Sequence, residues 1–285
     1  MKYGVTLPSS GIEGDVGRLV EFAYIAEEEG WDGVFLEDYI MYWGPEAVPA
    51  TFDSWVTMAA VAMRTRRVRL GITVTPLSRR RPWKVVREAV TLDHLSQGRL
   101  ILGFGLGDAN EKGFSSFGEV LDVRQRASML DEGLEIVVGL MSGEPFSHQG
   151  KHYHIDEVTF LPRPVQAPRI PIWIGGFWPR TAPALRAARW DGFCAAKVPD
   201  ASGNGSMTPT DIRFIKSFMD QHRTSMDGFD ITTGGQTFGL DRGQARAQVE
   251  ELAEAGATWW SEFALPEKPD EAEMILARIK QGPPR

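Results

Sequence analysis

The sequence is poor in the features that cross-link a chain or anchor it in a membrane. Among its 285 residues there is one cysteine, Cys194, so no disulfide can form within the chain, which favours a reducing compartment. No run approaches the ~20 apolar residues that a membrane-spanning helix needs. The first segment, Met1–Pro8, carries one positive charge and no apolar stretch of signal-peptide length. These absences predict a cytoplasmic protein that does not bind membranes.

Clustered positive charge and metal ligands are also scarce. The net charge is -7, and the basic run Arg79 to Arg81 is too short to form a nucleic-acid surface. His152 and His154 lie two residues apart, but two ligands without a third nearby do not make a metal site. We therefore expect a small-molecule substrate, no nucleic-acid partner and no required metal.

Short β-branched or aromatic runs alternate with helical patterns along the chain. This order is typical of parallel strands joined by helices, and eight such pairs favour a closed (β/α)8 barrel over an open doubly wound sheet. No linker or repeat divides the sequence, so we expect a single domain over residues 1–285. The expected strands are Tyr3–Leu7, Gly33–Glu37, Val68–Thr75, Leu100–Phe104, Ile170–Gly175, Gly192–Ala196, Asp230–Gly234 and Thr258–Phe263.

Local signals place several helices between these strands. Asp15 and Asp122 can accept hydrogen bonds from the first turn of a helix, and Pro82 and Pro209 suit the first helical turn. The segment 143–168 interrupts the alternation of strands and helices, because it contains several prolines and a short run of alternating side-chain character. We expect an inserted hairpin there, before the fifth strand. The hairpin and the loop after the sixth strand are expected to shape the substrate pocket.

The loop after the second strand, residues 37–44, is longer than a barrel needs. It brings together two acids and three large aromatic side chains. Active sites of (β/α)8 barrels lie at the C-terminal ends of the strands, so this loop is a candidate wall around a planar ring system. The alternative is a loop folded on its own aromatic side chains.

Two glycine-rich segments follow the fourth and fifth strands. Residues 103–111 let the backbone approach a ligand but match neither a dinucleotide fingerprint nor a P-loop. Gly175 and Gly176, followed by Arg180 and Thr181 at a helix start, combine amides, a cation and a hydroxyl that suit a phosphate. The alternative for this second segment is a plain strand-to-helix turn.

Other reactive residue types are expected to serve packing. Cys194 lies beside two alanines in a predicted strand, which indicates a small barrel residue and not a nucleophile. His94 falls within a predicted helix, and Trp259 and Trp260 alternate inward and outward in the last strand. No Ser-His-Asp arrangement stands out.

Five segments together resemble the bacterial luciferase-like superfamily. They occur in the same order as in that family, along roughly the first two thirds of the chain. Each segment alone is only weakly specific for the family, but their combination is specific. The segments are AEEEGWDGVF (26–35), LGITVTPLSRRRPW (70–83), LDHLSQGRL (92–100), IPIWIGG (170–176) and AARWDG (187–192).

The resemblance implies a barrel that binds reduced FMN or the deazaflavin coenzyme F420 at its mouth. Many members have a non-proline cis peptide in the third strand that backs the ring, and the matching bond here is Thr73–Val74. The family commonly dimerises, which implies a homodimer, and use of FMN implies a flavin reductase as a supplier of reduced flavin.

The resemblance also implies site residues. Asp38, Trp43 and Asp108 match positions of the deazaflavin-using members, whereas Tyr39 replaces their histidine. Tyrosine ionises at about pH 10 and cannot serve as a base at neutral pH. We expect Asp108 and Tyr39 at the reacting face. The expected cofactor contacts are Asp38, Trp43, Thr73, Val74, Gly107, Gly175, Gly176, Arg180 and Thr181.

The resulting hypothesis is an oxidoreductase that uses FMN or F420 for monooxygenation or for hydride transfer on a small organic substrate. Two alternatives remain at this point. One is a flavin-binding relative without catalytic activity. The other is a metal-free barrel aldolase or isomerase acting on a sugar phosphate, for which Lys197 is the one lysine near a strand end.

Overall fold

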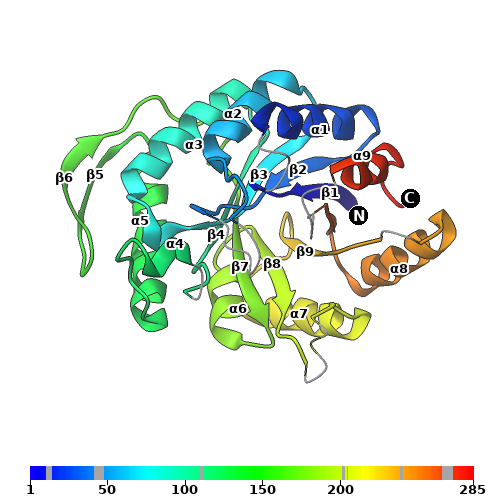
Figure 1. The fold of residues 1–285 in the computed structure, drawn as a ribbon. Coiled ribbons are helices and arrows are strands. Elements are labelled where there is room, and N and C mark those ends of the chain that lie inside the picture. The colour runs from blue at the N-terminus through cyan, green and yellow to red at the C-terminus, as the bar shows by residue number, and fades with distance from the viewer. Residues whose placement is uncertain are drawn as a thin grey trace.

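The computed structural model describes residues 1–10, 15–41, 48–109, 112–200, 203, 205–237, 240–264 and 272–285. Eight parallel strands close into a barrel, with β1 hydrogen-bonded to both β2 and β10 (Figure 1). The expected (β/α)8 architecture is confirmed. The barrel strands are β1 (Lys2–Leu7), β2 (Gly33–Leu36), β3 (Arg69–Pro76), β4 (Leu100–Gly105), β7 (Ile172–Trp178), β8 (Gly192–Lys197), β9 (Asp230–Gly235) and β10 (Trp259–Phe263).

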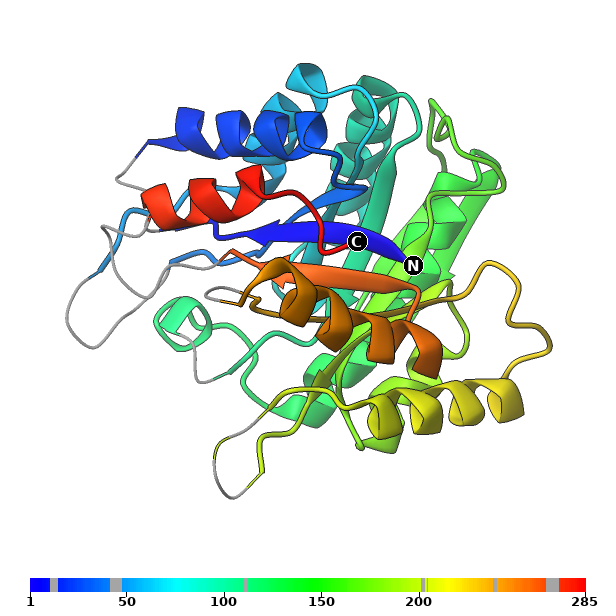
Figure 2. The same ribbon diagram turned by 90° about the vertical axis from the view of Figure 1, so that its right-hand side faces the viewer.

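The helices surround the barrel, and α1 and α9 lie side by side outside β1 (Figures 1 and 2). Within the described residues, no helix combines the length and the apolar character needed to cross a bilayer. The helices are α1 (Val16–Glu28), α2 (Ser54–Arg64), α3 (Pro82–Ser96), α4 (Lys112–Ser115), α5 (Val123–Met141), α6 (Thr181–Ala187), α7 (Pro209–His222), α8 (Arg242–Ala255) and α9 (Ala272–Lys280), with a 3-10 turn η1 (Leu77–Arg79) before α3.

The helix starts follow the expected local signals. The Asp15 side chain accepts a hydrogen bond from Gly17 N at 2.8 Å, and α1 begins at the next residue. Asp122 caps α5 in the same way, and Pro82 and Pro209 are the first residues of α3 and α7. These contacts satisfy amides that the first turn of a helix leaves without an intrahelical acceptor.

The fifth barrel strand differs from its expected bounds. The sequence predicts a strand over Ile170–Gly175 followed by a turn. In the structure β7 extends to Trp178, so the predicted end of this strand is wrong. Gly175 and Gly176 are paired with Cys194 and Ala195 of β8 and therefore lie inside the strand. Glycine is permissive enough to suggest a turn from sequence, but the neighbouring strand supplies the hydrogen-bonding partners that keep this segment extended.

Aromatic side chains fill the lower part of the barrel interior. Phe35, Trp173 and Trp259 contact one another with ring centroids 5.5 to 5.6 Å apart, and Ile101 packs with them. Trp260, the next residue, belongs instead to the core between the strands and the helices, as the alternation predicted. The barrel interior is thus a packed core below its mouth.

Buried polar contacts fasten the N-terminal ends of the strands. The Glu27 carboxylate at the end of α1 accepts hydrogen bonds from three successive amides, those of Arg66, Arg67 and Val68, directly before β3. The Arg99 guanidinium, just before β4, donates to the carbonyl oxygens of Val68 and of residues 62 and 65. These contacts set where β3 and β4 begin relative to α1 and α2.

The inserted segment forms the expected hairpin, β5 (Pro145–Gln149) and β6 (His154–Thr159). Glu132 of α5 accepts hydrogen bonds from the amides of His152 and Tyr153 in its turn, and Asp93 of α3 accepts from Val165 N at 2.8 Å in its return. Figure 1 shows the hairpin outside α5, away from the middle of the barrel. The hairpin therefore packs on the outer side of these helices, and its expected role in shaping the substrate pocket stays a prediction.

Replacement of Glu27 by glutamine should lower the free energy of unfolding at pH 7 by about 1–3 kcal/mol, because an amide cannot satisfy three backbone donors. Although burial opposes it, hydrogen bonds from these amides lower the pKa of Glu27 below its ordinary value. A depressed pKa stabilises the fold above the unfolded-state pKa, and this contribution disappears as the pH falls through the folded-state pKa.

Urea denaturation at several pH values checks this prediction. The wild type should lose stability relative to Glu27→Gln as the pH falls from about 5 to about 3. Glu28→Gln, at the half-exposed neighbour, is the matched control and should change stability by less than about 0.5 kcal/mol. Equal effects of the two substitutions would contradict the role of Glu27.

Candidate active site

The Val74 side chain occupies the barrel interior between β4 and β7. The Thr73–Val74 peptide is cis, as the family resemblance implied. A Cβ added at Gly105 would lie 2.5 Å from one Val74 methyl group, and a Cβ added at Gly175 would lie 2.6 Å from the other. These two glycines therefore make room for Val74, which presents a fixed apolar surface near the ends of the strands.

The layer above the aromatic floor consists of small side chains. Thr6 of β1 and Ser261 of β10 share a hydrogen bond of 2.6 Å between their hydroxyl groups. Cys194 packs on the aromatic cluster, and burial raises the pKa of its thiol to about 12, so it is a packed thiol and not a nucleophile. In the adjoining strands, Gly175 makes room for the Val74 side chain and Gly234 makes room for the Phe263 ring.

Two aromatic side chains stand at the C-terminal ends of inward-facing rows. Phe177 follows Trp173 and Gly175 in β7, and Phe263 follows Trp259 and Ser261 in β10. Their side chains are 47% and 37% exposed. The alternation of inward and outward side chains along each strand places both phenylalanines at the mouth. Phe177 was not predicted there, because the sequence predicted that the fifth strand ends at Gly175.

The loop after β2 is held by an ion pair. The carboxylate of Asp38 accepts two hydrogen bonds from Arg80, at 2.9 and 3.1 Å, and its side chain is 1% exposed. Arg79 donates to the Asp38 carbonyl oxygen at 2.9 Å. Asp38 thus joins this loop to the segment after β3. Its expected contact with a cofactor stays a prediction.

Glu37, one residue earlier, carries an ionisable group with a shifted pKa. Glu37 is partly buried, and this burial raises the pKa of its carboxyl group to about 7. The Ser54 hydroxyl donates a hydrogen bond to its backbone carbonyl oxygen. The sequence shows an acid at this position, but its burial at a strand end cannot be seen in the local sequence.

The segment after β4 is anchored from α5. The Arg126 guanidinium donates to the carbonyl oxygens of Leu106 and Gly107 at 2.8 and 2.9 Å. Gly107 has a φ of +69°, a conformation that favours glycine, and the exposed Asp108 next to it interacts electrostatically with Arg126. The segment holds Asp108 at the C-terminal end of β4.

The remaining predicted contacts are dispersed. Tyr39 is partly buried after Asp38, and Trp43 lies outside the described residues. Arg180 is exposed, with its guanidinium carbon 5.7 Å from the centre of the Phe177 ring. Gly176 faces α6, because a Cβ there would lie 2.2 Å from Pro183. Gly176 therefore provides close strand-helix packing, while exposed Thr181 begins α6.

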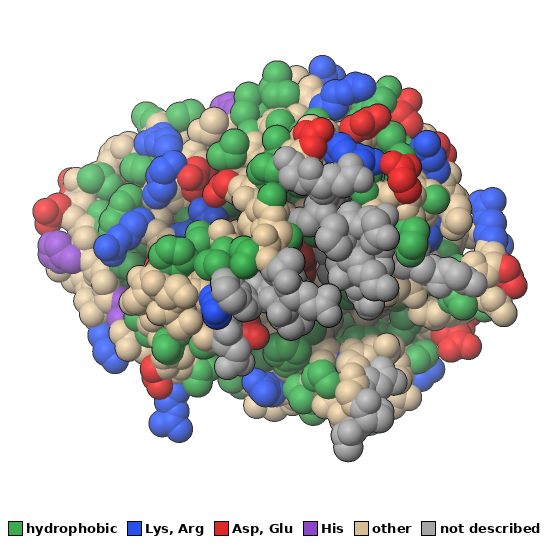
Figure 3. All heavy atoms as spheres, viewed as in Figure 1, with side chains coloured by type: hydrophobic (Ala, Val, Ile, Leu, Met, Phe, Trp, Pro, Cys, Tyr) green, Lys and Arg blue, Asp and Glu red, His purple; other side chains and the backbone are tan. Residues whose placement is uncertain are grey.

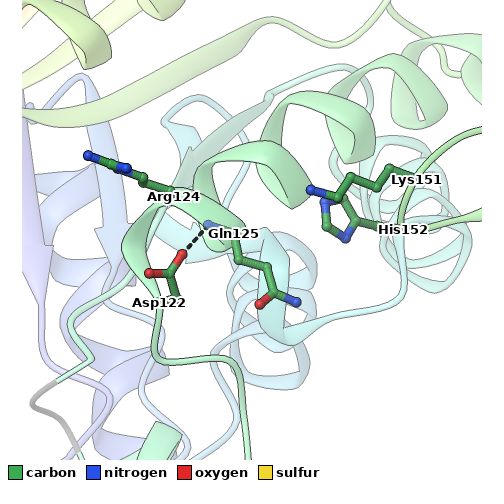
Figure 4. Close-up of a pocket in the computed structure, with 5 residues that line it drawn as sticks. All are labelled: Asp122, Arg124, Gln125, Lys151 and His152. Atoms are coloured by element: carbon green, nitrogen blue, oxygen red, sulfur yellow. Dashed lines mark hydrogen bonds between the residues drawn. The ribbon is translucent and has the colours of Figure 1, made fainter.

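Two pockets lie away from the C-terminal ends of the strands. One, of about 560 Å³, lies between the start of α5 and the hairpin turn, where Lys151 and His152 face Gln125 (Figure 4). His152 bonds to Ser128 there, and no metal-ligand cluster occurs among the residues described. The other, of about 600 Å³, lies at the N-terminal ends of the strands. The charged linings do not suit an apolar ring.

Neither the charged side chains on the face shown in Figure 3 nor Lys197 at the end of β8 indicates a polyanionic partner or a Schiff-base site. Basic and acidic side chains are intermixed over the face shown in Figure 3. Lys197, at the end of β8, forms a 2.8 Å ion pair with Asp211 of α7. A lysine held in this way is a weak candidate for the amine nucleophile of an aldolase.

The sequence matches the model of the luciferase-like monooxygenase family over residues 1–253. The chain belongs to this family. The match covers strands β1 to β9 and most of α8. Membership of this oxidoreductase family confirms the resemblance found in the sequence.

Curated relatives include F420-dependent glucose-6-phosphate dehydrogenases. That of Microbacterium testaceum (strain StLB037) is 34% identical over 170 residues, covering 57% of this chain and 47% of the relative. That of Amycolatopsis mediterranei (strain U-32) is 33% identical over 195 residues, covering 68% of this chain and 56% of the relative. The chain thus spans about half the length of the curated relatives it matches.

Solved structures share the fold over nearly the whole chain. An F420-dependent secondary alcohol dehydrogenase, in complex with an F420-acetone adduct, has a TM-score of 0.79 at 16% identity, with 99% of this chain and 98% of that chain covered. The monooxygenase RslO1 from Streptomyces bottropensis has a TM-score of 0.73 at 22% identity, with the same coverage. At these identities the comparison establishes the luciferase-like barrel.

The packing of Val74 gives a test by paired substitution. Gly175→Ala should lower the free energy of unfolding by about 1–3 kcal/mol, because its new methyl group overlaps Val74. When Val74→Ala is combined with it, the added effect of Gly175→Ala should fall below about 0.5 kcal/mol.

Denaturant titrations of the two single variants and the double variant measure this coupling. Gly205→Ala is the control, because a Cβ there meets its nearest atom at an ordinary 3.5 Å. Additive effects of Gly175→Ala and Val74→Ala would show that the two residues do not share this space.

Proposed function

We propose that the protein is an F420-dependent oxidoreductase that transfers hydride between the coenzyme and a small organic alcohol or carbonyl compound. The observation that carries the proposal is the apolar surface of Val74, fixed between Gly105 and Gly175 at the mouth of a luciferase-like barrel. A barrel mouth is where this fold places its reactions.

The residues at the mouth fit a deazaflavin ring system. Val74 offers an apolar surface, Thr6 and Ser261 contribute small hydroxyl side chains, and Phe177 and Phe263 offer exposed aromatic faces. When bound, the coenzyme supplies a carbon that accepts or donates hydride. The chain contributes orientation, exclusion of water and control of protons.

The choice of F420 over FMN rests on the curated relatives, which are named as F420-dependent dehydrogenases at 33 to 34% identity. Asp38, Trp43 and Asp108 match that type of site in sequence. We assign Asp108 and Tyr39 to the reacting face and Trp43 to its wall. Arg180 and Thr181, beyond the end of β7, remain the proposed phosphate contacts.

The proposal also covers the domain organisation, the cellular location and the oligomeric state of the protein. We infer one domain over the whole chain, a cytoplasmic location and a homodimer. Exposed apolar side chains gather before and at the start of α5, at Phe117, Leu121 and Val123, and could be covered by a second copy. A flavin reductase is a partner only if FMN replaces F420.

Coenzyme binding tests the proposed function. Titration followed by F420 fluorescence should give a Kd below about 100 μM, or about -5.5 kcal/mol, and FMN should bind at least about tenfold more weakly. Val74→Ala should weaken F420 binding several-fold because it removes the apolar surface. Val158→Ala, on the hairpin, is the control. Tighter binding of FMN would overturn the choice of coenzyme, and failure of both to bind would overturn the function.

Sedimentation tests the dimer separately. At micromolar concentration we expect a species of twice the 31.7 kDa chain mass. A Phe117→Ser and Val123→Ser variant should shift the equilibrium toward the monomer, because it removes apolar area that the interface would bury. A wild-type species of 31.7 kDa would contradict the dimer.

A further inference from the structure

Glu37 directly follows β2 (Gly33–Leu36), and the alternation of side chains along that strand indicates that it is directed into the barrel interior. Two residues earlier, the Phe35 ring lies inside the barrel, where a Cβ added at Gly4 or Gly71 would meet it at 2.5 or 2.9 Å. Leu36 packs in the core between strands and helices. Because side chains alternate along a strand, Glu37 continues the inward row of Phe35 and stands above the aromatic floor.

The backbone around Glu37 is held on both sides. The Ser54 hydroxyl, at the start of α2, donates to the Glu37 carbonyl oxygen, and the Arg80 guanidinium holds the next side chain, Asp38. In the part of the chain that the structure describes, no ion pair involves the Glu37 carboxylate. The main chain is therefore fixed while the carboxyl group remains available to a bound molecule.

The charges near Glu37 are paired with one another. Asp38 binds Arg80 and lies 3.7 Å from Arg79, and Asp53 at the start of α2 lies 3.9 Å from Arg80. Burial is the cause of the shift that raises the pKa of Glu37 to about 7. Its carboxyl group therefore changes protonation at neutral pH, which is where proton transfer to and from a substrate is most effective.

We propose that Glu37 is the catalytic residue that exchanges a proton with the substrate oxygen in the reaction assigned above, on which this inference rests. In the oxidation of an alcohol, the carbinol C–H bond breaks and hydride passes to the oxidised deazaflavin. The O–H bond breaks as its proton passes to the Glu37 carboxylate, and the C=O bond forms. In reduction of a carbonyl compound the protonated carboxyl group returns the proton.

Other groups near the mouth are less suited to this exchange. None of the five histidines lies at the C-terminal end of a barrel strand. The hydroxyl of a tyrosine such as Tyr39 ordinarily ionises at about pH 10. Asp38 is committed to Arg80, and Asp108 is exposed. Glu37 combines burial, an inward direction and a carboxylate that is not committed to an ion pair.

The first test measures protonation in the protein without coenzyme. Infrared difference spectra should show a protonated carboxyl band that titrates near pH 7 in the wild type. This band should be absent in Glu37→Gln and unchanged in Glu251→Gln, a control on the exposed side of α8. Since the folded-state pKa is raised, the wild-type melting temperature should fall relative to Glu37→Gln as the pH rises from about 5 to about 8.

The second test measures the role in the reaction. Glu37→Gln should bind F420 within about threefold of the wild type, yet lower kcat/KM by about 100-fold or more and abolish the ionisation near neutral pH in its pH profile. Glu37→Asp should retain an ionisation and part of the rate. Asp108→Asn should keep the wild-type ionisation, because it leaves Glu37 intact.

The outcomes separate this inference from the proposed function. If the wild type binds F420 and reacts but Glu37→Gln keeps the rate and pH profile, the inference is wrong and the function stands. Loss of the ionisation in Asp108→Asn but not in Glu37→Gln would also overturn it. If the wild type does not bind F420, the function fails, and the catalytic role of Glu37 fails with it.

Discussion

Closure of a parallel barrel requires each strand to begin at a defined height, because the last strand must meet the first in register. Hydrogen bonds between strands do not by themselves fix this position, because one strand can shift along its neighbour to another register. In this protein Glu27 binds the amides that precede β3, and Arg99 binds the carbonyl oxygens around the same turn. Asp191 likewise accepts from Ile172 N at the start of β7. The position of every side chain at the opposite end depends on these starting points.

The mouth of the barrel depends on a different feature, which is the small size of several side chains near the C-terminal ends of the strands. Aromatic rings fill the lower interior, and the strands then carry small residues toward their C-terminal ends. Gly105 and Gly175 have no side chains, and the Val74 side chain occupies the space beside them. Val74 therefore gives the barrel interior an apolar surface at this level. A flat coenzyme and a buried carboxyl group at Glu37 suit the same space, since both require little water and a fixed wall.

Much of this could be predicted from the sequence because it depends on local patterns. The alternation of strands and helices predicted the barrel, Asp15 and Asp122 predicted helix starts, and the family motif predicted the cis peptide at Thr73–Val74.

Features that depend on contacts between distant segments could not be predicted in this way. The end of β7 depends on pairing with β8, and the raised pKa of Glu37 depends on its burial in the folded chain. The same holds for Glu262 and Arg278, a buried ion pair that joins β10 to α9 and is invisible in either local sequence.

The placement of the anchoring contacts has an evolutionary consequence. Glu27, Asp93, Arg99 and Asp191 lie in the very segments by which the sequence resembles its family, and they serve strand starts and the hairpin junction. The residues proposed to meet the substrate lie at the other end of the strands. Distant substitutions tend to act independently on stability. A lineage could therefore exchange one substrate for another at the mouth while its scaffold, and with it the recognisable sequence signature, stays unchanged.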